Sequence, residues 1–210
     1  MRFIPMLFAV TLLAVTQTEA QETKMMYKST ETPAYQVEKT LAEAEIRLYA
    51  PRIVAEVTVT GSRSGAASDG FRVLAGYIFG GNTGQAKVAM TSPVAQMPAE
   101  KIAMTSPVTQ TAIDGAWVVQ FTMPSEYTLN SLPKPKDTNI RFVPQAADRQ
   151  LVLQFSGLAG AAVLAEKEVQ LRAIATANGL ELAAGPMYYF YDAPFTLPWN
   201  RRNEVAFYLR

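Results

Sequence analysis

The sequence predicts an α+β domain in which a mostly antiparallel β-sheet, bent or closed into a barrel, carries two helices. Two observations lead to this fold class. Segments with the alternation typical of strands come in two sets, and one helix-like segment interrupts each set. So many strands would also leave exposed edges in an open sheet, and closure removes them. The chain has 210 residues, a length that suits one domain with a substantial core.

Three strand-like segments, YQVEKT, AEIRLYA and RIVAEVTVT, come before the first helix. The third is the clearest, because its apolar residues recur at every second position, the period of a strand. The residues expected on its apolar face are Ile53, Ala55, Val57 and Val59. The run GSRSGAASDG then separates this strand from the helix that follows.

The segment GFRVLAGYIFGG has the apolar spacing of a helix, with Ser68 or Asp69 as its cap and Gly80-Gly81 at its end. Its inward residues are expected to be Phe71, Leu74, Ala75 and Ile78. Its outer face is expected to show Arg72, Val73, Gly76 and Tyr77. Because Gly76 has no side chain, a planar ligand could lie there with Arg72 near an acidic group. The alternative is that Val73 and Tyr77 are ordinary half-exposed residues, and spacing does not separate the two.

A near-duplicate decapeptide follows, KVAMTSPVAQ at 87–96 and KIAMTSPVTQ at 101–110, joined by MPAE. Two short copies are too few for a solenoid. Alternating apolar residues that meet Pro93 or Pro107 favour two short neighbouring strands instead. Met90 and Met104 could ligate a soft metal, although alternating methionines in strands usually fill a core.

The second set repeats the order of the first. AWVVQFTMP, IRFVP and RQLVLQFSG are strand-like, and a helix is expected from Ala161 to Asn178, ended by Gly179. Leu164, Leu171 and Ile174 form its apolar stripe. PMYYFYD and NEVAFYLR close the chain as strands, separated by the loop APFTLPWNRR.

Aromatic residues gather near the last two strands. Alternation sends Tyr189 and Tyr191 to the face opposite Tyr188 and Phe190. One of these faces is expected to be core and the other a binding site, with Phe195 and Trp199 on the adjoining loop.

Composition excludes several chemistries. The chain has no His and no Cys, which removes the Ser-His-Asp triad, thiol catalysis and the usual zinc and iron ligands. No catalytic or metal site is therefore predicted. Nineteen basic against eighteen acidic residues give no overall field that would gather nucleic acid or an anionic membrane.

The N-terminus predicts export. Residues 1–20 place one Arg before an apolar run too short to span a membrane, which is typical of a signal peptide cleaved after Ala20. We expect a flexible segment at 21–31, a binding domain at 32–210, and a mature protein that is soluble, without a membrane span, in the periplasm or outside the cell.

Several motifs together resemble the SOUL haem-binding family. They are AEIRLYAPRIVAEVTV, GFRVLAGYIFGGN, the two AMTSPV motifs, FTMPSEYTLNSLPKP and YDAPFTLPWNRRNEV, and they cover nearly all of the expected mature chain. The resemblance implies a distorted β-barrel flanked by two helices. Its halves would be related by a pseudo-twofold axis, as in the effector-binding domains of multidrug-responsive transcription regulators. It also implies haem or tetrapyrrole binding without catalysis.

In that family the tetrapyrrole is placed on the outer face of the first helix and beside the loop before the Arg-Arg-Asn-Glu motif. In this chain those regions are Arg72, Val73, Gly76 and Tyr77, and the segment from Tyr191 to Trp199, whose Tyr191, Phe195 and Trp199 are the expected binding residues. Tyr189 joins them because alternation places it on the same face as Tyr191. Some members are proposed to hold iron through a His, which this chain lacks, so an iron ligand would have to be Tyr, Met, Lys or water. We therefore expect a non-enzymatic carrier or buffer of haem or metal-free porphyrin. The alternatives are a receptor for another flat or amphiphilic molecule, and an enzyme that acts on tetrapyrroles.

Overall fold

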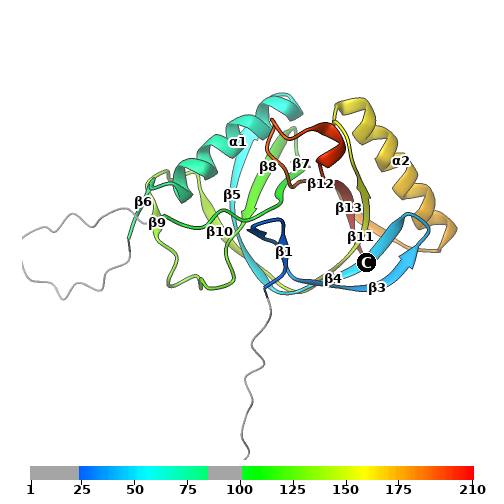
Figure 1. Ribbon diagram of the computed structural model, residues 1–210, viewed down its shortest axis with the longest axis horizontal. Helices are drawn as coiled ribbons and strands as arrows, with labels where there is room; N and C mark the ends of the chain where they lie inside the picture. Colours follow the sequence, from blue (N-terminus) through cyan, green and yellow to red (C-terminus); the bar gives the residue numbers. More distant parts are fainter. Residues whose placement is uncertain (1–23, 85–100) are drawn as a thin grey trace, which may run out of the picture.

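Nine antiparallel strands form one curled sheet, a half-barrel that carries both long helices on its outer side (Figure 1). The computed structural model describes residues 24–84 and 101–210. In sheet order the strands are β10 (Arg141–Gln145), β5 (Arg52–Thr60), β8 (Ala116–Thr122), β7 (Val108–Ile113), β12 (Leu182–Phe190), β13 (Asn203–Leu209), β11 (Asp148–Phe155), β4 (Ala44–Tyr49) and β3 (Tyr35–Leu41). The helices are α1 (Arg63–Ile78), α2 (Ala161–Ala177) and the short 3₁₀ helix η1 (Pro198–Asn200). Two further pairs are β1 (Met26–Tyr27) with β2 (Thr30–Glu31), and β6 (Asn82–Thr83) with β9 (Lys134–Pro135).

The strand order shows the predicted pseudo-twofold relation. The unit β4-β5-α1-β7-β8 matches the unit β10-β11-α2-β12-β13, and β7 pairs with β12 where the two units meet. The first strand of each unit pairs with a strand of the other unit: β10 pairs with β5, and β4 pairs with β11. The α+β fold class is thus confirmed, with a half-barrel whose edge strands, β10 and β3, stand at opposite ends of the order.

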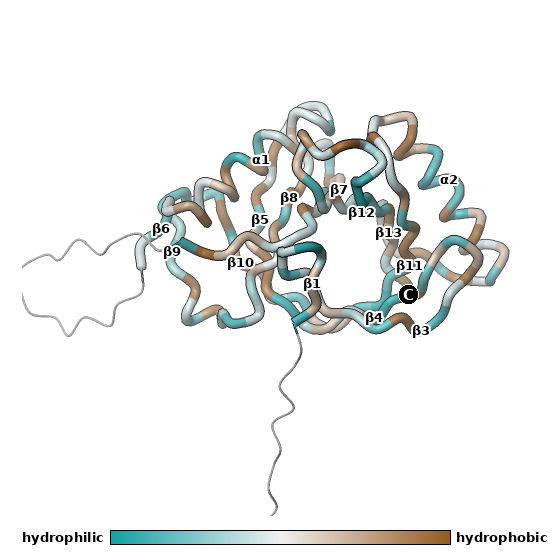
Figure 2. Tube along the Cα trace, in the orientation of Figure 1, coloured by the Kyte–Doolittle hydropathy of each residue, from teal (hydrophilic) through white to brown (hydrophobic). Residues whose placement is uncertain are grey.

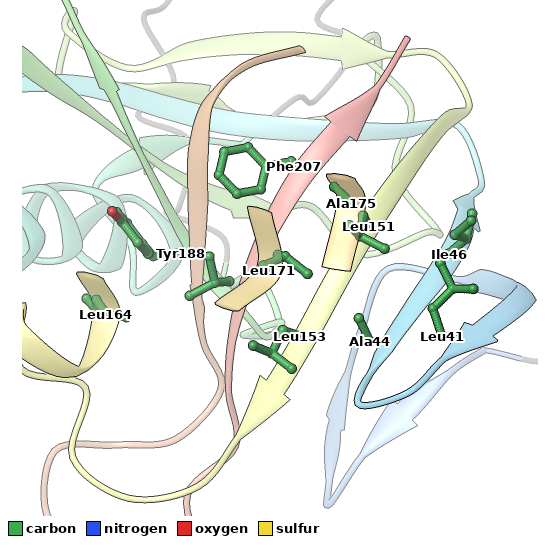
Figure 3. Packing of buried hydrophobic residues seen from close by; sticks show 11 residues of the cluster. Leu41, Ala44, Ile46, Leu151, Leu153, Leu164, Leu171, Ala175, Tyr188 and Phe207 are labelled. Atoms are coloured by element: carbon green, nitrogen blue, oxygen red, sulfur yellow. The ribbon is translucent and has the colours of Figure 1, made fainter. Parts of the chain in front are cut away.

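Each helix packs on its own half of the sheet, so two apolar clusters form the core. Under α2, Leu164, Leu171 and Ala175 meet residues of β4, β11 and β13, including Phe207 (Figure 3). The predicted α2 is confirmed to within one residue at its end, and its stripe includes Ala175, while Ile174 is only partly buried. Hydrophobic and hydrophilic stretches accordingly alternate along both helices (Figure 2).

Helix α1 begins earlier than the spacing predicts. Ser62 is the N-cap, its hydroxyl oxygen accepting from the Gly65 N–H at 3.2 Å, so the predicted caps Ser68 and Asp69 lie inside the helix. The missing side chain of Gly70 brings α1 close to β8, since a Cβ there would lie 2.6 Å from Val119. The helix ends at Ile78, two residues before Gly80, whose φ of 118° suits glycine.

The predicted placement of Tyr77 on the outer face of α1 is wrong. Tyr77 is 1% exposed, and its hydroxyl donates to the carbonyl of Pro133 at 2.9 Å. The chain around β9 and β10, with Leu132 and Ile140 in the same cluster, covers that side of the helix. Phe71, expected to point inward, is 39% exposed and meets Phe121 edge-on at a centroid distance of 5.5 Å. The buried stripe is therefore turned toward Leu74, Tyr77 and Ile78.

The N-terminal hairpin, residues 24–31, lies against both halves of the sheet. The main-chain carbonyl of Glu31 accepts from the Ser106 N–H at 2.9 Å, and Tyr27 meets Tyr191 edge-on. The sequence predicts a flexible segment at 21–31, and these contacts hold its described part, 24–31, against the rest of the domain. The expected signal peptide, residues 1–20, lies outside the described residues.

Only the second copy of the decapeptide, 101–110, lies within the described residues. The first copy, 87–96, lies outside the described residues, and so does its expected pairing with the second. In the second copy, β7 begins at Val108, after Pro107, and Lys101–Ser106 belongs to none of the named strands. Ile102 is buried, whereas Met104 is exposed.

Candidate functional site

A hollow of about 520 Å³ lies between the outer edge of α1 and the end of β12. We call it the α1 groove. Its lining residues are Ala67, Ser68, Phe71, Arg72 and Ala75 of α1, together with Val108, Phe190, Asp192 and Pro194. The groove forms because α1 packs against β8. The last residue of β12, Phe190, and the loop that follows it lie along the same side of α1. The volume lies in the usual range for small-molecule sites.

The walls of the α1 groove are apolar and its edges are charged. Phe71, Phe190 and Pro194 offer flat faces, while Arg72 stands at the rim with its side chain 76% exposed. The Arg72 guanidinium pairs with Asp69 at 2.9 Å on the same helix. Exposed pairs of this kind contribute about 1 kcal/mol at most, so Arg72 is free to turn toward an acidic group on a ligand.

Asp192 is the carboxylate of the α1 groove, and the N-terminal hairpin neutralises it. Its side chain accepts from the Lys28 ammonium, from the Tyr27 hydroxyl at 3.1 Å and from the Arg202 N–H at 2.7 Å. Burial would raise the pKa of Asp192, but these hydrogen bonds hold it below its usual value. A buried, compensated charge therefore lies beside an apolar wall.

A second hollow of about 320 Å³ lies on the other side of Arg72. Its lining includes Val73, Gly76, Tyr77 and Lys136. Val73 is half-buried and Gly76 is exposed, as predicted. Among residues 24–84 and 101–210, no atom outside the adjoining helix backbone lies within 4 Å of the position that a Cβ at Gly76 would take. Arg72 thus borders both hollows, and the outer side of α1 is open around Gly76.

The structure separates Tyr189 and Tyr191 from the α1 groove. Alternation is as predicted: Tyr188 and Phe190 face the helices, whereas Tyr189 and Tyr191 face the concave side of the sheet. The Tyr189 hydroxyl donates to Gln150 Oε1 at 2.7 Å, and the Tyr191 hydroxyl donates to Glu204 Oε2 at 2.9 Å. Burial raises the pKa of both phenols well above the usual value, which disfavours the phenolate form that would ligate iron.

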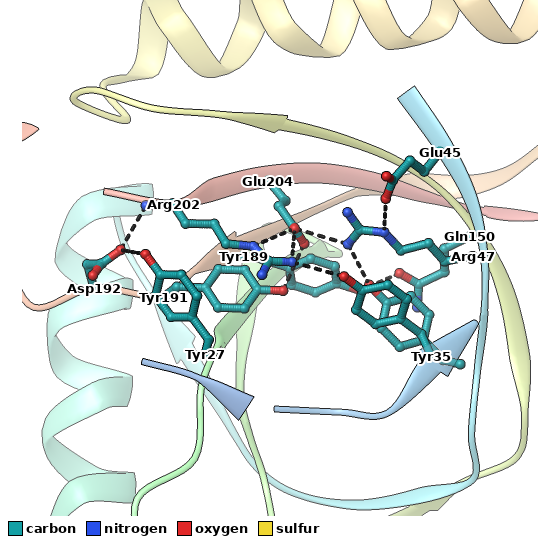
Figure 4. A network of polar contacts seen from close by, with 11 residues as sticks. Tyr27, Tyr35, Glu45, Arg47, Gln150, Tyr189, Tyr191, Asp192, Arg202 and Glu204 are labelled. Atoms are coloured by element: carbon teal, nitrogen blue, oxygen red, sulfur yellow. Dashed lines mark hydrogen bonds and ion pairs between the residues drawn. The ribbon is translucent and has the colours of Figure 1, made fainter. Parts of the chain in front are cut away.

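A buried network of charges fills much of the concave side (Figure 4). Glu204 is fully buried and accepts from Arg47 at 3.0 Å and from Arg202 at 2.6 Å. Arg47 also pairs with Glu45, and the Arg202 guanidinium lies 4.1 Å from the Tyr191 ring centroid. Burial opposes the charge of the two arginines, yet the nearby Glu204 carboxylate raises the pKa of each. Next to this network remains a hollow of only about 20 Å³, room for a water-sized group.

A larger hollow of about 350 Å³ opens under the N-terminal hairpin. Its lining includes four prolines, Pro33, Pro51, Pro124 and Pro144. The charged groups there are already paired, since Glu31 binds Lys24 at 3.2 Å and Arg52 binds Asp148 at 2.8 Å. This site offers shape and apolar surface but no free charge from those two pairs.

Phe195 and Trp199 project from the loop after β12 and line none of these hollows. Phe195 is 90% exposed and Trp199 is 70% exposed. Of the predicted site residues, the structure brings only Arg72 into the α1 groove, with Val73, Gly76 and the edge of Tyr77 at the adjoining hollow. The sequence analysis expected Phe71 in the core and put the site on the strand face of Tyr189, opposite Phe190. It covered Asp192 only as part of the segment from Tyr191 to Trp199.

The described residues offer few groups that could ligate a metal ion. Within residues 24–84 and 101–210 no group of three or more acidic side chains could hold a metal ion. Met104 is exposed, and Met90 lies outside the described residues. No described helix combines the length and the apolar character needed to cross a bilayer.

Solved structures share this fold at low identity. The crystal structure of the EcmrR C-terminal domain superposes with a TM-score of 0.58 at 14% identity, covering 84% of this chain and 98% of that one. A hydrolase from Listeria innocua superposes with a TM-score of 0.51 at 12% identity, covering 82% and 94%. At these identities the likeness shows the fold alone. No curated protein sequence matches the chain.

The sequence itself matches one family over most of its length. The model of the SOUL heme-binding protein family covers residues 30–208. This range contains both long helices, the nine-stranded sheet except Leu209, and every residue of the α1 groove. The chain belongs to the SOUL heme-binding protein family.

Proposed function

We propose that this protein binds haem or another tetrapyrrole in the α1 groove and acts as a carrier or buffer without catalysis. The observation that carries the proposal is the combination of aromatic walls, Phe71 and Phe190, with a rim guanidinium, Arg72, around about 520 Å³. Two parts of the groove belong to the regions that the family resemblance implies: Arg72 on the first helix, and Asp192 and Pro194 in the loop before Arg201.

Ring binding is expected to rest on apolar contact and on Arg72. Apolar burial contributes about 25 cal/mol per Å², and aromatic pairs add about 1 kcal/mol. A propionate on the ring would pair with the Arg72 guanidinium in place of Asp69. Because the chain has no His, iron adds little to the attachment, and metal-free protoporphyrin should bind within about tenfold of haem, or 1.4 kcal/mol.

A non-enzymatic role is supported by the chemistry of the groove. Its carboxylate, Asp192, has a pKa below its usual value and is held by three donors, so it is a poor proton donor at neutral pH. The chain also has neither His nor Cys. The ring should therefore be recovered unchanged after incubation, and product analysis by chromatography checks this.

Export is part of the proposal. The first 20 residues have the pattern of a signal peptide, and a carrier outside the cytoplasm would begin at or near Gln21. N-terminal sequencing of the protein recovered outside the cytoplasm tests this. An intact Met1 on a cytoplasmic species would contradict it.

Titration with haem and with metal-free protoporphyrin, followed by absorbance and by quenching of tryptophan emission, tests the site. Phe71→Ala and Arg72→Gln should each weaken binding by about tenfold, while Phe79→Ala, an exposed aromatic at the end of α1, should not. Equal losses in all three variants would contradict the α1 groove. No binding of either ring to the wild-type protein would favour a receptor for another amphiphilic molecule, for which the hollow under the hairpin offers a second volume.

A further inference from the structure

One end of the molecule gathers exposed apolar side chains around the N-termini of both long helices. The loop after β12 lies there beside the start of α1 and the start of α2 (Figure 1). The Gly157 N–H donates to the Pro198 carbonyl at 2.9 Å, and Arg63 of α1 donates to the Ala159 carbonyl at 3.2 Å. Three segments distant in sequence, 61–68, 156–165 and 193–201, therefore form one surface, which we call the loop face.

Four large apolar side chains of the loop face are exposed instead of packed in the core. Besides Phe195 and Trp199, Leu158 is 60% exposed and Leu197 is 52% exposed. Exposed apolar patches of this kind on soluble proteins mark interaction sites. Trp and Phe on a protruding loop suit a boundary between water and hydrocarbon, where an aromatic ring can be partly buried.

The loop is held in place with these side chains pointing out. Thr196 N–H donates to the Ala193 carbonyl at 2.9 Å, and Asn200 N–H donates to the Leu197 carbonyl at 2.9 Å. The Arg201 guanidinium donates to the Thr196 carbonyl at 2.7 Å, and the Lys28 ammonium donates to the Asn200 carbonyl. A loop ordered in this way loses little further conformational entropy when it binds a surface.

The charged residues inside the three segments of the loop face are all basic, while Asp69, Glu166 and Asp192 lie directly outside these segments. The three segments contain Arg63 and Arg201 and no acidic residue. Neither α1 nor α2 has an acidic residue in its first turn, and the N-cap of α2, Gly160, makes no side-chain capping bond. Among the described residues Arg63 has no ion-pair partner, and its Nε is buried without a hydrogen bond. The positive ends of two helices and the Arg201 guanidinium thus lie beside the exposed apolar residues, whereas the Arg63 guanidinium is turned toward the rings of Tyr188 and Phe190.

From this arrangement we propose that the loop face docks on a lipid bilayer that carries anionic headgroups, with Phe195, Leu197 and Trp199 entering the interface. The near-neutral chain as a whole gives no long-range field, so the attraction is local and basic groups near the headgroups supply it. Pro194, at the start of this loop, also lines the α1 groove. An apolar ligand could therefore pass between the bilayer and the groove without crossing much water.

Vesicle binding without any tetrapyrrole tests the proposal independently of the function proposed above. The chain has two Trp residues, so a Trp117→Phe background leaves Trp199 as the only tryptophan emitter. Adding vesicles of phosphatidylcholine with about one quarter phosphatidylglycerol should shift its emission to the blue, and raising the salt from about 0.05 M to 0.5 M should weaken binding. Sedimentation with the same vesicles gives the affinity.

Matched variants locate the contact. Phe195→Ser with Leu197→Ser should reduce vesicle affinity by about tenfold or more. Phe79→Ser, at an apolar residue that is 62% exposed at the far end of α1, should leave it unchanged. All variants keep the same N-terminus, established by sequencing, so an apolar leader cannot cause the difference. Absence of wild-type binding to these vesicles, or equal loss in Phe79→Ser, would overturn the proposal.

Discussion

Gly76 offers a test in which stability and ligand binding should change in opposite directions. It lies in the last turn of α1 and is exposed, and within the described part of the chain no atom outside its own stretch of helix lies within 4 Å of the place that a Cβ would take. Its backbone φ is not among the positive values found at the turn glycines. Replacing an unstrained helical glycine gains about 0.5 to 1 kcal/mol. For a domain of this size that gain corresponds to a melting temperature higher by about 1 to 4 °C.

The two substitutions Gly76→Ala and Gly76→Glu should differ only in binding. Glu at position 76 lies four residues after Arg72, the spacing at which opposite charges pair on a helix. It would draw the Arg72 guanidinium away from the rim of the α1 groove, and a lost hydrogen bond to a charged group costs about 1.5 to 3 kcal/mol. Porphyrin affinity should therefore fall by about tenfold or more in Gly76→Glu and stay unchanged in Gly76→Ala.

Thermal unfolding and porphyrin titration of the two variants decide the question. A lower melting temperature in Gly76→Ala would mean that the helix surface at Gly76 is packed against something in the folded protein. Unchanged affinity in Gly76→Glu would remove Arg72 from the list of ligand contacts and would place the ring elsewhere.

Two further variants probe the charges that hold the structure together. Lys28→Ala should lower thermal stability at neutral pH, because it removes a partner of the buried Asp192 carboxylate. The pKa of Asp192 is depressed in the folded state, so its stabilisation is present above the ordinary aspartate value of about 3.9 and is lost as the pH falls through the folded value. The gap between wild type and Lys28→Ala should therefore begin to narrow below about pH 4 and close below the folded pKa of Asp192, and a gap that persists at still lower pH would point to lost packing instead. Glu204→Gln should destabilise the fold by about 3 to 5 kcal/mol in denaturant titrations, because it leaves the Arg47 and Arg202 charges buried without their carboxylate. Its folded fraction should still bind porphyrin with wild-type affinity, and weaker binding would place the ligand on the concave side.

Local patterns in the sequence determined much of the fold. Period-two alternation identified the strands and separated Tyr189 from Phe190, and the helical spacing with Gly179 placed α2 to within one residue. These features depend on neighbours in sequence, because side-chain direction in a strand or helix follows from backbone geometry alone. The absence of His likewise determined that no imidazole can ligate iron.

Contacts between distant segments decided the rest. Tyr77 is buried because the chain near Leu132 and Ile140 folds over the end of α1, and no local period contains that information. The charge of Asp192 is compensated by Lys28, 164 residues away in the sequence. The α1 groove therefore has no uncompensated negative charge from Asp192 beside its apolar walls. The loop face likewise exists only because β12, α1 and α2 end or begin at the same place. The sequence by itself determined which residues could share a face, whereas tertiary packing decided which faces met, since burial depends on what covers a side chain.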